Sequence, residues 1–149
     1  MIREASIEDI SVIQEFQISL AAETEEMELD RELSLLGVKA VFNTPDQGNY
    51  WVYEDNGEIV GCLLTQFEWS DWRNGAVVWI HSVYVKQQNR GQGIYRRMYE
   101  SLQTVVREKG FCGIRLFVDK TNVGAQKTYT RLGMSGDHYH LFEWMRDGW

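Results

Sequence analysis

Two glycines near the middle of the chain stand where a strand-like run gives way to a long helical pattern. Residues 83–94 read VYVKQQNRGQGI, so Gly91 and Gly93 follow a polar turn and precede apolar positions at helical spacing. The first N–H groups of a helix have no acceptor inside the helix, and the helix dipole adds about half a positive charge there, so a phosphate can bind against them. Glycine permits that close approach. The spacing predicts an anion-binding loop, with a tightly packed helix start as the alternative.

Two familiar phosphate motifs are excluded at this loop. A dinucleotide-binding fingerprint requires a third glycine at position 96, where the chain has Arg96. A P-loop requires Gly-Lys-Ser/Thr, which the sequence lacks. The G-x-G spacing alone therefore does not name the phosphate ligand.

Two side chains just before the loop are candidate bases. His81 lies in a strand-like run, and the usual pKa of histidine, near 6.5, suits proton transfer at neutral pH. The alternative for His81 is a hydrogen-bonded core residue. Glu68 ends the preceding strand-like run and is the rival base, although it could instead bind a cation or pair with Arg73.

The elements that must position these residues alternate in type. A capping-box-like pair, Ser6 and Asp9, starts a helix that continues through Leu20. Further helices are predicted at residues 30–42, 91–109 and 122–132, and strands at residues 2–4, 50–54, 58–68, 76–85, 112–118 and 138–145. Asn-Gly pairs at 56–57 and 74–75 predict tight turns. The unbroken apolar run 76–80 predicts the central strand of a mixed sheet flanked by helices.

The composition fits one self-sufficient domain over residues 1–149. The chain has 149 residues and is 44% hydrophobic, and a chain of this length buries about 70% of the surface that it exposes when unfolded. No apolar run reaches about 18 residues and the N-terminus is charged, so neither a membrane span nor a signal peptide is predicted. We expect a cytoplasmic protein. Cys62 and Cys112 lie in strand-like runs, which predicts reduced, buried thiols.

Charge is divided unevenly along the chain. Residues 1–60 carry 3 basic and 14 acidic side chains, a net −11, whereas residues 61–149 carry 12 and 8, a net +4. Because surface fields attract molecules of opposite charge, the first part favours a cationic ligand and the second an anionic one. The acidic segment at residues 23–32 contributes the largest share of this negative charge. It could attract a cationic ligand, and a solvated, charged helix face is the alternative interpretation. The overall charge of −7 argues against nucleic acid as the main partner.

Two motifs resemble those of the GCN5-related N-acetyltransferase (GNAT) superfamily. Residues 88–93, QNRGQG, are similar to its acetyl-CoA pyrophosphate loop, R/Q-x-x-G-x-G/A. Residues 122–134, NVGAQKTYTRLGM, are similar to its N-x-x-A-x-x-x-Y-x-x-L-G-F, with Met134 in place of the usual Phe. The order of elements also matches, so the resemblance spans residues 2–145. It implies an α/β fold of GNAT type: a single domain with a mixed, mostly antiparallel central sheet flanked by helices.

The resemblance implies acetyl-CoA as cosubstrate, and we expect no metal cofactor. Tyr129 would protonate the departing coenzyme A thiolate, and an unperturbed pKa of about 10 makes it a credible donor. A core tyrosine is the alternative, because Ala125, Tyr129 and Leu132 share one helical stripe. Arg97 and Lys127 would add positive charge near the cofactor. The residues expected to hold acetyl-CoA are Val83, Tyr84, Val85, Gln88, Arg90, Gly91, Gln92, Gly93, Ile94, Tyr95, Arg96 and Asn122.

A narrower resemblance concerns residues 66–85, which are similar to the diamine (spermidine/spermine and thialysine) acetyltransferase branch. Where that branch has an acidic residue on the central strand, this chain has His81 and Ser82. The acceptor is expected to be a small cationic amine, polyamine or lysine-like. A primary ammonium with a pKa of about 10.4 is neutral in fewer than about one molecule per thousand at pH 7. A base that removes the ammonium proton would therefore accelerate the reaction. The expected acceptor contacts are Glu26, Glu28, Trp69 and Asp71.

Several alternatives remain open at this stage. The chain could acetylate a protein N-terminus or lysine, or it could bind acyl-CoA without catalysis. His138 and His140 have strand spacing, but without a third ligand pattern they do not predict a metal site. We expect no nucleic-acid or membrane partner, and the superfamily resemblance suggests a homodimer.

Overall fold

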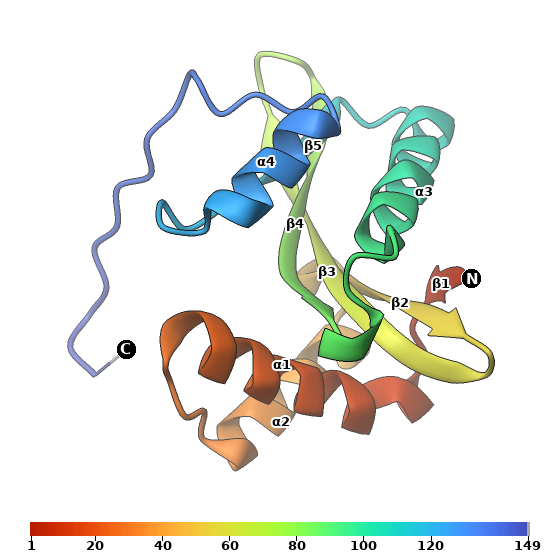
Figure 1. Cartoon of the computed structure of the whole chain (residues 1–149). Helices are drawn as coiled ribbons and strands as arrows, with labels where there is room; N and C mark the ends of the chain where they lie inside the picture. The colour runs from red at the N-terminus through yellow and green to blue at the C-terminus, as the bar shows by residue number, and fades with distance from the viewer. Residues whose placement is uncertain (149) are drawn as a thin grey trace. The chain divides into compact units, whose positions relative to one another are not determined.

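The computed structural model describes residues 1–148, and Trp149 lies outside the described residues (Figure 1). Every predicted element except the last strand is found, within a few residues of its expected bounds. The strands are β1 (Ile2–Glu4), β2 (Asn49–Asp55), β3 (Glu58–Ser70), β4 (Gly75–Val85) and β5 (Gly113–Leu116), and the α-helices are α1 (Ile10–Glu25), α2 (Arg31–Asn43), α3 (Ile94–Lys109) and α4 (Val123–Arg131).

The chain divides into two compact units, Met1–Phe117 and Val118–Trp149. The first contains the five strands with α1, α2 and α3, and the second contains α4. That the two units act as one domain over residues 1–149 stays a prediction.

The five strands of the first unit form one mixed sheet in the order β1-β2-β3-β4-β5. Strands β1 to β4 pair in antiparallel fashion, and β5 runs parallel to β4. This confirms the mixed, mostly antiparallel α/β architecture that the resemblance implies. The middle strand is β3, so the prediction that residues 76–80 form the centre was wrong: β4 lies next to the edge strand.

Helices cover the sheet of the first unit (Figure 1). Side chains of α1 and α2 pack on sheet residues to form one core cluster: Ile13, Phe16, Val38, Tyr50, Val52, Cys62 and Tyr84. On α3, Met98 and Leu102 are also fully or almost fully buried. Because successive strand residues point to opposite faces, Leu63 of β3, which is 0% exposed, faces away from its neighbour Cys62. The sheet therefore buries apolar side chains on both faces. This packing holds β4, which belongs to the sheet, in place.

Polar caps set where α2 begins and where the 3₁₀ turn Ile7–Asp9 that leads into α1 begins. The predicted capping box at Ser6 and Asp9 is present, and the Asp9 carboxylate also accepts hydrogen bonds from Arg3 Nη1 at 2.7 Å and Nη2 at 3.1 Å. Asp30 caps α2, with its Oδ1 accepting from the Leu33 backbone N–H at 2.8 Å. These local interactions explain why the helix starts could be predicted from the sequence.

The two Asn-Gly pairs have different roles. Asn56 and Gly57 have φ of 50° and 80°, which confirms the tight turn between β2 and β3. The second prediction holds only for Asn74, which has a φ of 49° and closes the four-residue loop 71–74; it was wrong for Gly75, which pairs with Ser70 inside the strands. Gly75 is required by packing instead: a Cβ there would lie 2.6 Å from the sulfur of Cys112.

Residues 138–145, predicted as a strand, form neither helix nor strand. The alternation of side chains is that of a strand, but a strand is stable only when a neighbour accepts and donates its backbone hydrogen bonds. No such neighbour is found within residues 1–148. Large apolar side chains of this segment are consequently exposed, Phe142 by 92% and Trp144 by 87%.

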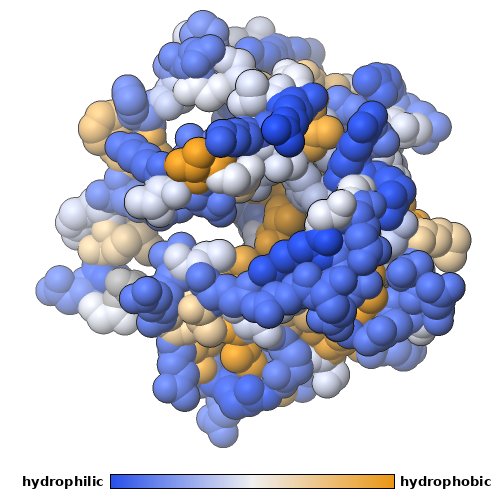
Figure 2. Space-filling model, viewed as in Figure 1, coloured by the Kyte–Doolittle hydropathy of each residue, from blue (hydrophilic) through white to orange (hydrophobic). Residues whose placement is uncertain are grey.

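Hydrophobic side chains also remain visible elsewhere among a mainly hydrophilic surface (Figure 2). The two cysteines differ: Cys62 is buried as expected, whereas Cys112, just before β5, is exposed, so the prediction of two buried thiols was wrong for Cys112. No helix among residues 1–148 is long and apolar enough to cross a membrane.

Candidate active site

The pairing of β4 with β5 stops halfway along β4. Their register runs from Val77 opposite Gly113 to Ile80 opposite Leu116. Beyond this point β4 continues to Val85 with β3 on one side and, among the described residues, no strand on the other. A bulge lies at the same place: Ser82 has a φ of 51°, and the β3–β4 register shifts by one residue. The end of β4 therefore has one open backbone edge.

The backbone groups on that open edge can be assigned to residues. The Lys86 N–H donates to the Val60 carbonyl of β3 at 2.9 Å, so Lys86 faces the sheet. The Val85 carbonyl accepts instead from Nε of Arg90 at 2.8 Å. Neighbouring peptide groups of a strand point in opposite directions, so the main-chain groups of residues two apart point the same way. The main-chain groups of Val83 therefore point outward, as those of Val85 do. Val83 and Val85 thus have the geometry expected of main-chain groups that bind an extended ligand, whereas the Tyr84 side chain is buried in the core.

The glycine loop follows directly. The helix was predicted from residue 91, but α3 begins at Ile94, because Gly91 and Gly93 adopt left-handed φ values of 76° and 75° that a helix excludes. The first helical hydrogen bond runs from the Arg97 N–H to the Gly93 carbonyl. A Cβ on Gly91 would meet nothing within 4 Å. The N–H groups at the start of α3 therefore lie beside a loop with space for an anion.

Arg90 is held by the end of α1. Its Nη2 lies 2.5 Å from Oε2 of Glu23, and Oε1 of Glu23 accepts from the Tyr84 hydroxyl and the Gln87 amide, each at 3.2 Å. Burial acts to raise the pKa of Glu23, but the hydrogen bond and charge of Arg90 outweigh it, so that the pKa lies below its usual value. Glu23 is thus ionised and ties α1 to the loop before α3.

The remaining side chains of the predicted cofactor site differ in accessibility. Gln88 and Gln92 are exposed, and the Gln92 amide donates to the Gln88 carbonyl at 3.2 Å. Arg96 is exposed and pairs with Glu100 one turn along the helix at 2.7 Å. Ile94 is 3% exposed, so that only its backbone can serve a ligand. The roles that the sequence predicts for Tyr95, Arg97 and Lys127 stay predictions.

An aromatic cluster surrounds His81 on β4. Its ring stacks on Trp79 at a centroid distance of 6.0 Å and an interplanar angle of 12°, and lies 5.8 Å from the ring of Phe117. Burial lowers the pKa of His81 below its usual value, so its imidazole is neutral at pH 7. Among residues 1–148 no hydrogen bond to its side chain is found. A neutral, half-buried imidazole without an internal partner is able to accept a proton.

Glu68 lies near this cluster but is already engaged. Its Oε2 accepts from the indole N–H of Trp79, and its Oε1 accepts from Nη1 of Arg115 at 3.2 Å. The expected alternative pairing with Arg73 is wrong, because Arg73 donates to Ser70 Oγ instead. Glu68 therefore orients Trp79, which in turn packs on His81, and its role as rival base is the weaker of the two.

The four predicted acceptor contacts lie in two places along the chain. Trp69 and Asp71 lie at the end of β3 and just after it, whereas Glu26 and Glu28 follow the end of α1. Trp69 is 65% exposed and points to the opposite face of β3 from Glu68, because adjacent strand residues alternate. Asp71 lies in the β3–β4 loop, where its Oδ1 accepts from the Trp72 N–H at 3.0 Å. Glu26 ends α1 with a φ of 51°, and Glu28 follows it, both exposed.

The second unit holds the other predicted motif. Asn122 caps α4, with Oδ1 accepting from the Ala125 N–H at 3.1 Å. Tyr129 is half-buried, and burial raises its pKa above the usual value, so the phenol keeps its proton at neutral pH. Both observations are compatible with the predicted roles, and the catalytic role of Tyr129 stays a prediction.

Several residues that shape the candidate active site could not be identified from the sequence. Glu23 was only one of many acidic residues, and its partner Arg90 is 67 positions away. Arg115 and Phe117 approach the His81 cluster through the pairing of β4 with β5. Only Ser82 had a local signal, since a polar residue interrupts the apolar run of β4.

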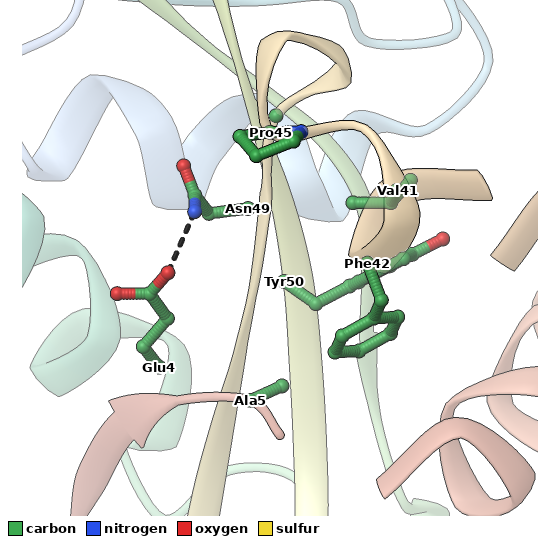
Figure 3. A pocket seen from close by; sticks show the side chains of 8 residues that line it. Glu4, Ala5, Val41, Phe42, Pro45, Asn49 and Tyr50 are labelled. Carbon is green, nitrogen blue, oxygen red and sulfur yellow. Dashed lines mark hydrogen bonds between the residues drawn. The ribbon is translucent and has the colours of Figure 1, made fainter. Parts of the chain in front are cut away.

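A cavity of about 250 Å³ lies elsewhere, where α2 and its following turn meet β1 and β2 (Figure 3). Across it, the Asn49 amide donates to Glu4 Oε1 at 2.6 Å. None of the predicted site residues lines this cavity. Residues 1–148 contain no group of three or more His, Cys, Asp or Glu side chains that could hold a metal.

Comparisons with known proteins identify the family of this chain. A crystal structure named as that of a possible acetyltransferase from Clostridium difficile 630 is 37% identical, with a TM-score of 0.91 over 98% of this chain and 97% of that one. A protein from Clostridium acetobutylicum described as a predicted acetyltransferase, solved with acetyl-CoA, shares the fold at 19% identity, a TM-score of 0.76 and coverage of 96% and 95%. Thialysine N-epsilon-acetyltransferase of Bos taurus is 35% identical over 75 residues, which are 50% of this chain and 44% of that protein.

The matched stretch thus spans less than half of that curated relative. The sequence also matches the family described as "Acetyltransferase (GNAT) family" over residues 4–134, which is most of the chain and includes both the glycine loop and the Tyr129 motif. The resemblance noted from the two motifs is confirmed, and the chain belongs to the GNAT family of acetyltransferases.

Proposed function

We propose that the chain is an acetyl-CoA-dependent N-acetyltransferase that acetylates a primary amine of a small cationic acceptor, polyamine or lysine-like. The observation that carries the proposal is the open backbone edge of β4 beside the left-handed glycines before α3. The loop suits the pyrophosphate, and the outward groups of Val83 and Val85 suit the pantetheine arm. A fold neighbour solved with acetyl-CoA supports this choice of ligand.

The reaction is a direct transfer in a ternary complex. The amine nitrogen attacks the thioester carbonyl, a C–N bond forms, and the tetrahedral intermediate collapses with loss of the C–S bond. The neutral imidazole of His81 takes the proton of the ammonium, directly or through water. The Tyr129 phenol gives its proton to the departing coenzyme A thiolate and regains one from the attacking nitrogen, which thereby becomes the neutral amide nitrogen, and His81 releases the ammonium proton to solvent. A backbone N–H at the β4 bulge stabilises the developing oxyanion, a contribution of about 3 kcal/mol for one well-placed donor.

A cationic acceptor is supported by two independent observations. The first 60 residues carry a net charge of −11, which favours a cation over a neutral or anionic amine. The Bos taurus relative is named for thialysine, a lysine-like amine. The proposal also treats both units as one GNAT domain over residues 1–149, since the family match crosses the boundary between them. A cytoplasmic location, a homodimer and the lack of nucleic-acid and membrane partners stay predictions from the sequence.

The proposal is tested with acetyl-CoA and a panel of polyamines, lysine analogues, aminoglycosides and peptides, with acetylated products measured by mass spectrometry. We expect turnover of small polyamines or lysine analogues. Turnover of peptides alone would replace the small-amine acceptor with a protein substrate. Binding of acetyl-CoA by calorimetry without turnover of any amine would leave only an acyl-CoA-binding module.

A further inference from the structure

Arg90, the residue just before Gly91, contacts three other parts of the first unit. Its Nη2 lies 2.5 Å from Glu23 Oε2, its Nε donates to the Val85 carbonyl at 2.8 Å, and its guanidinium lies 5.5 Å from the centre of the Tyr84 ring. A guanidinium at this distance from an aromatic ring makes a cation–π contact. The side chain of Arg90 therefore joins the end of α1 to the end of β4.

Two of these contacts use groups that acetyl-CoA would need. The Val85 carbonyl is one of the outward main-chain groups suited to the pantetheine arm, and it already accepts from Arg90. The same guanidinium is one of the cations expected at the diphosphate. A diphosphate has more negative charge than one carboxylate, and hydrogen bonds from arginine to phosphate are among the strong ones in proteins. Binding of acetyl-CoA would therefore draw Arg90 away from Glu23 and open the Val85 carbonyl to the pantetheine arm.

Glu23 would then be a carboxylate without its cation. Within residues 1–148, Arg90 is its only ion-pair partner, and its side chain is 28% exposed. The Tyr84 hydroxyl and the Gln87 amide, which donate to Oε1, are neutral groups and leave Oε2 open. A charge that loses its partner gains a new cation favourably. Glu23 also begins the acidic segment at residues 23–32, whose field attracts cations.

We propose that the Glu23–Arg90 ion pair is exchangeable and couples the two substrates. The diphosphate of acetyl-CoA takes Arg90, and the ammonium group of the acceptor takes Glu23. The ion pair is broken once, by whichever substrate binds first, so the second substrate meets a partner that is already free. Each substrate therefore strengthens the binding of the other by the same factor. This inference rests on the proposed function, because it takes acetyl-CoA and a cationic amine as the two ligands.

Calorimetry with coenzyme A and spermidine measures the coupling without turnover, because coenzyme A has no acetyl group to transfer. In the unmodified chain, saturating coenzyme A should tighten spermidine binding by about 5-fold or more, and spermidine should tighten coenzyme A binding equally. Glu23→Gln should reduce this factor to about one, and Glu23→Asp, which keeps the charge, should restore part of it. Glu25→Gln, at an exposed glutamate of the same helix end, should leave the factor unchanged.

The outcomes separate the inference from the function on which it rests. Coupling in Glu23→Gln equal to that of the unmodified chain would overturn the inference and leave the proposed function intact. An unmodified chain that binds neither coenzyme A nor acetyl-CoA would overturn the proposed function itself.

Removing Arg90 gives the sharper test, because it frees Glu23 permanently. Arg90→Gln should strengthen spermidine binding in the absence of coenzyme A by about 5-fold or more, although it weakens coenzyme A binding. A residue that only bound the cofactor or only supported the fold would not have this effect. Arg96→Gln removes the same charge from the ion pair with Glu100 and should leave spermidine binding without coenzyme A unchanged. Unchanged or weaker spermidine binding by Arg90→Gln would refute the exchange.

Discussion

His81 shows how the surroundings of one side chain set its chemical use. Partial burial, in part beneath the Trp79 ring, lowers its pKa, so the neutral form persists to lower pH than in an exposed histidine. A base is inactive once protonated, so kcat/KM should begin to fall at a lower pH than it would with an exposed histidine as the base.

Replacing this base should remove that dependence. His81→Gln is expected to lower kcat/KM by about 100-fold or more, the range of general base catalysis, and to abolish its acidic limb. The measurement is the pH profile of kcat/KM, with His138→Gln, an exposed histidine, as control. An unchanged profile would transfer the role to Glu68, to water or to no residue.

Tyr129 offers a second test at the scale of one atom. Tyr129→Phe removes the phenolic proton that burial keeps in place, so kcat should fall at least about 10-fold while acetyl-CoA still binds. Kinetics and calorimetry on the same preparation separate these effects. Tyr99→Phe on α3 makes the same chemical change at a buried tyrosine and should preserve kcat. Full turnover by Tyr129→Phe would exclude the phenol as the acid.

The start of α3 carries the main prediction at the scale of elements. Gly91 and Gly110 both have left-handed φ, of 76° and 72°, and a Cβ on either would meet nothing within 4 Å. Gly91→Ala and Gly110→Ala should therefore destabilise the fold by similar amounts, about 1–2 kcal/mol. Only Gly91→Ala should also weaken acetyl-CoA binding, because only Gly91 lies in the loop before α3. Equal affinities in a calorimetric titration would remove the loop from the cofactor site.

The cap of α1 predicts how stability depends on pH. Asp9 is 5% exposed, and the hydrogen bonds that its carboxylate accepts from Arg3 outweigh burial and lower its pKa. It therefore stabilises the fold at pH values above its unfolded pKa, and this contribution is lost as the pH falls through the lowered folded pKa. Asp9→Asn should cost about 1.5–3 kcal/mol at pH 7 and less in strong acid, by urea unfolding. Asp46→Asn, an exposed change, should cost almost nothing at either pH.

The elements also show how far sequence could go. Helix starts at Ser6 and Asp30 and the turn at residues 56–57 depend on neighbours within three residues, so local patterns were sufficient. The Glu23–Arg90 ion pair and the Glu68–Trp79 contact join different elements, so no local pattern indicated them. Gly75 was mistaken for a turn residue because its requirement, the nearby Cys112 sulfur, is visible only after folding.

At the scale of the whole molecule, the division of charge predicts a dependence on salt. The net charges of −11 and +4 in the two parts of the chain attract cations and anions respectively, and salt screens such attraction beyond about 10 Å at 0.1 M. Raising the salt concentration from about 20 mM to about 500 mM should therefore raise the KM of a tetra-amine several-fold more than that of a monoamine. Steady-state kinetics at constant pH measure this ratio. A salt effect that is the same for both amines would rule out steering by the acidic part.

The contrast between the two cysteines has a practical consequence. Burial raises the pKa of Cys62 to about 12, whereas Cys112 is open to solvent. A chromogenic disulfide reagent should therefore react rapidly with one sulfur per native chain and with two once a denaturant is added. In a colorimetric assay of coenzyme A release, the first equivalent is a burst from Cys112 that must be subtracted from the product signal, and any slow second equivalent reports unfolding during the assay.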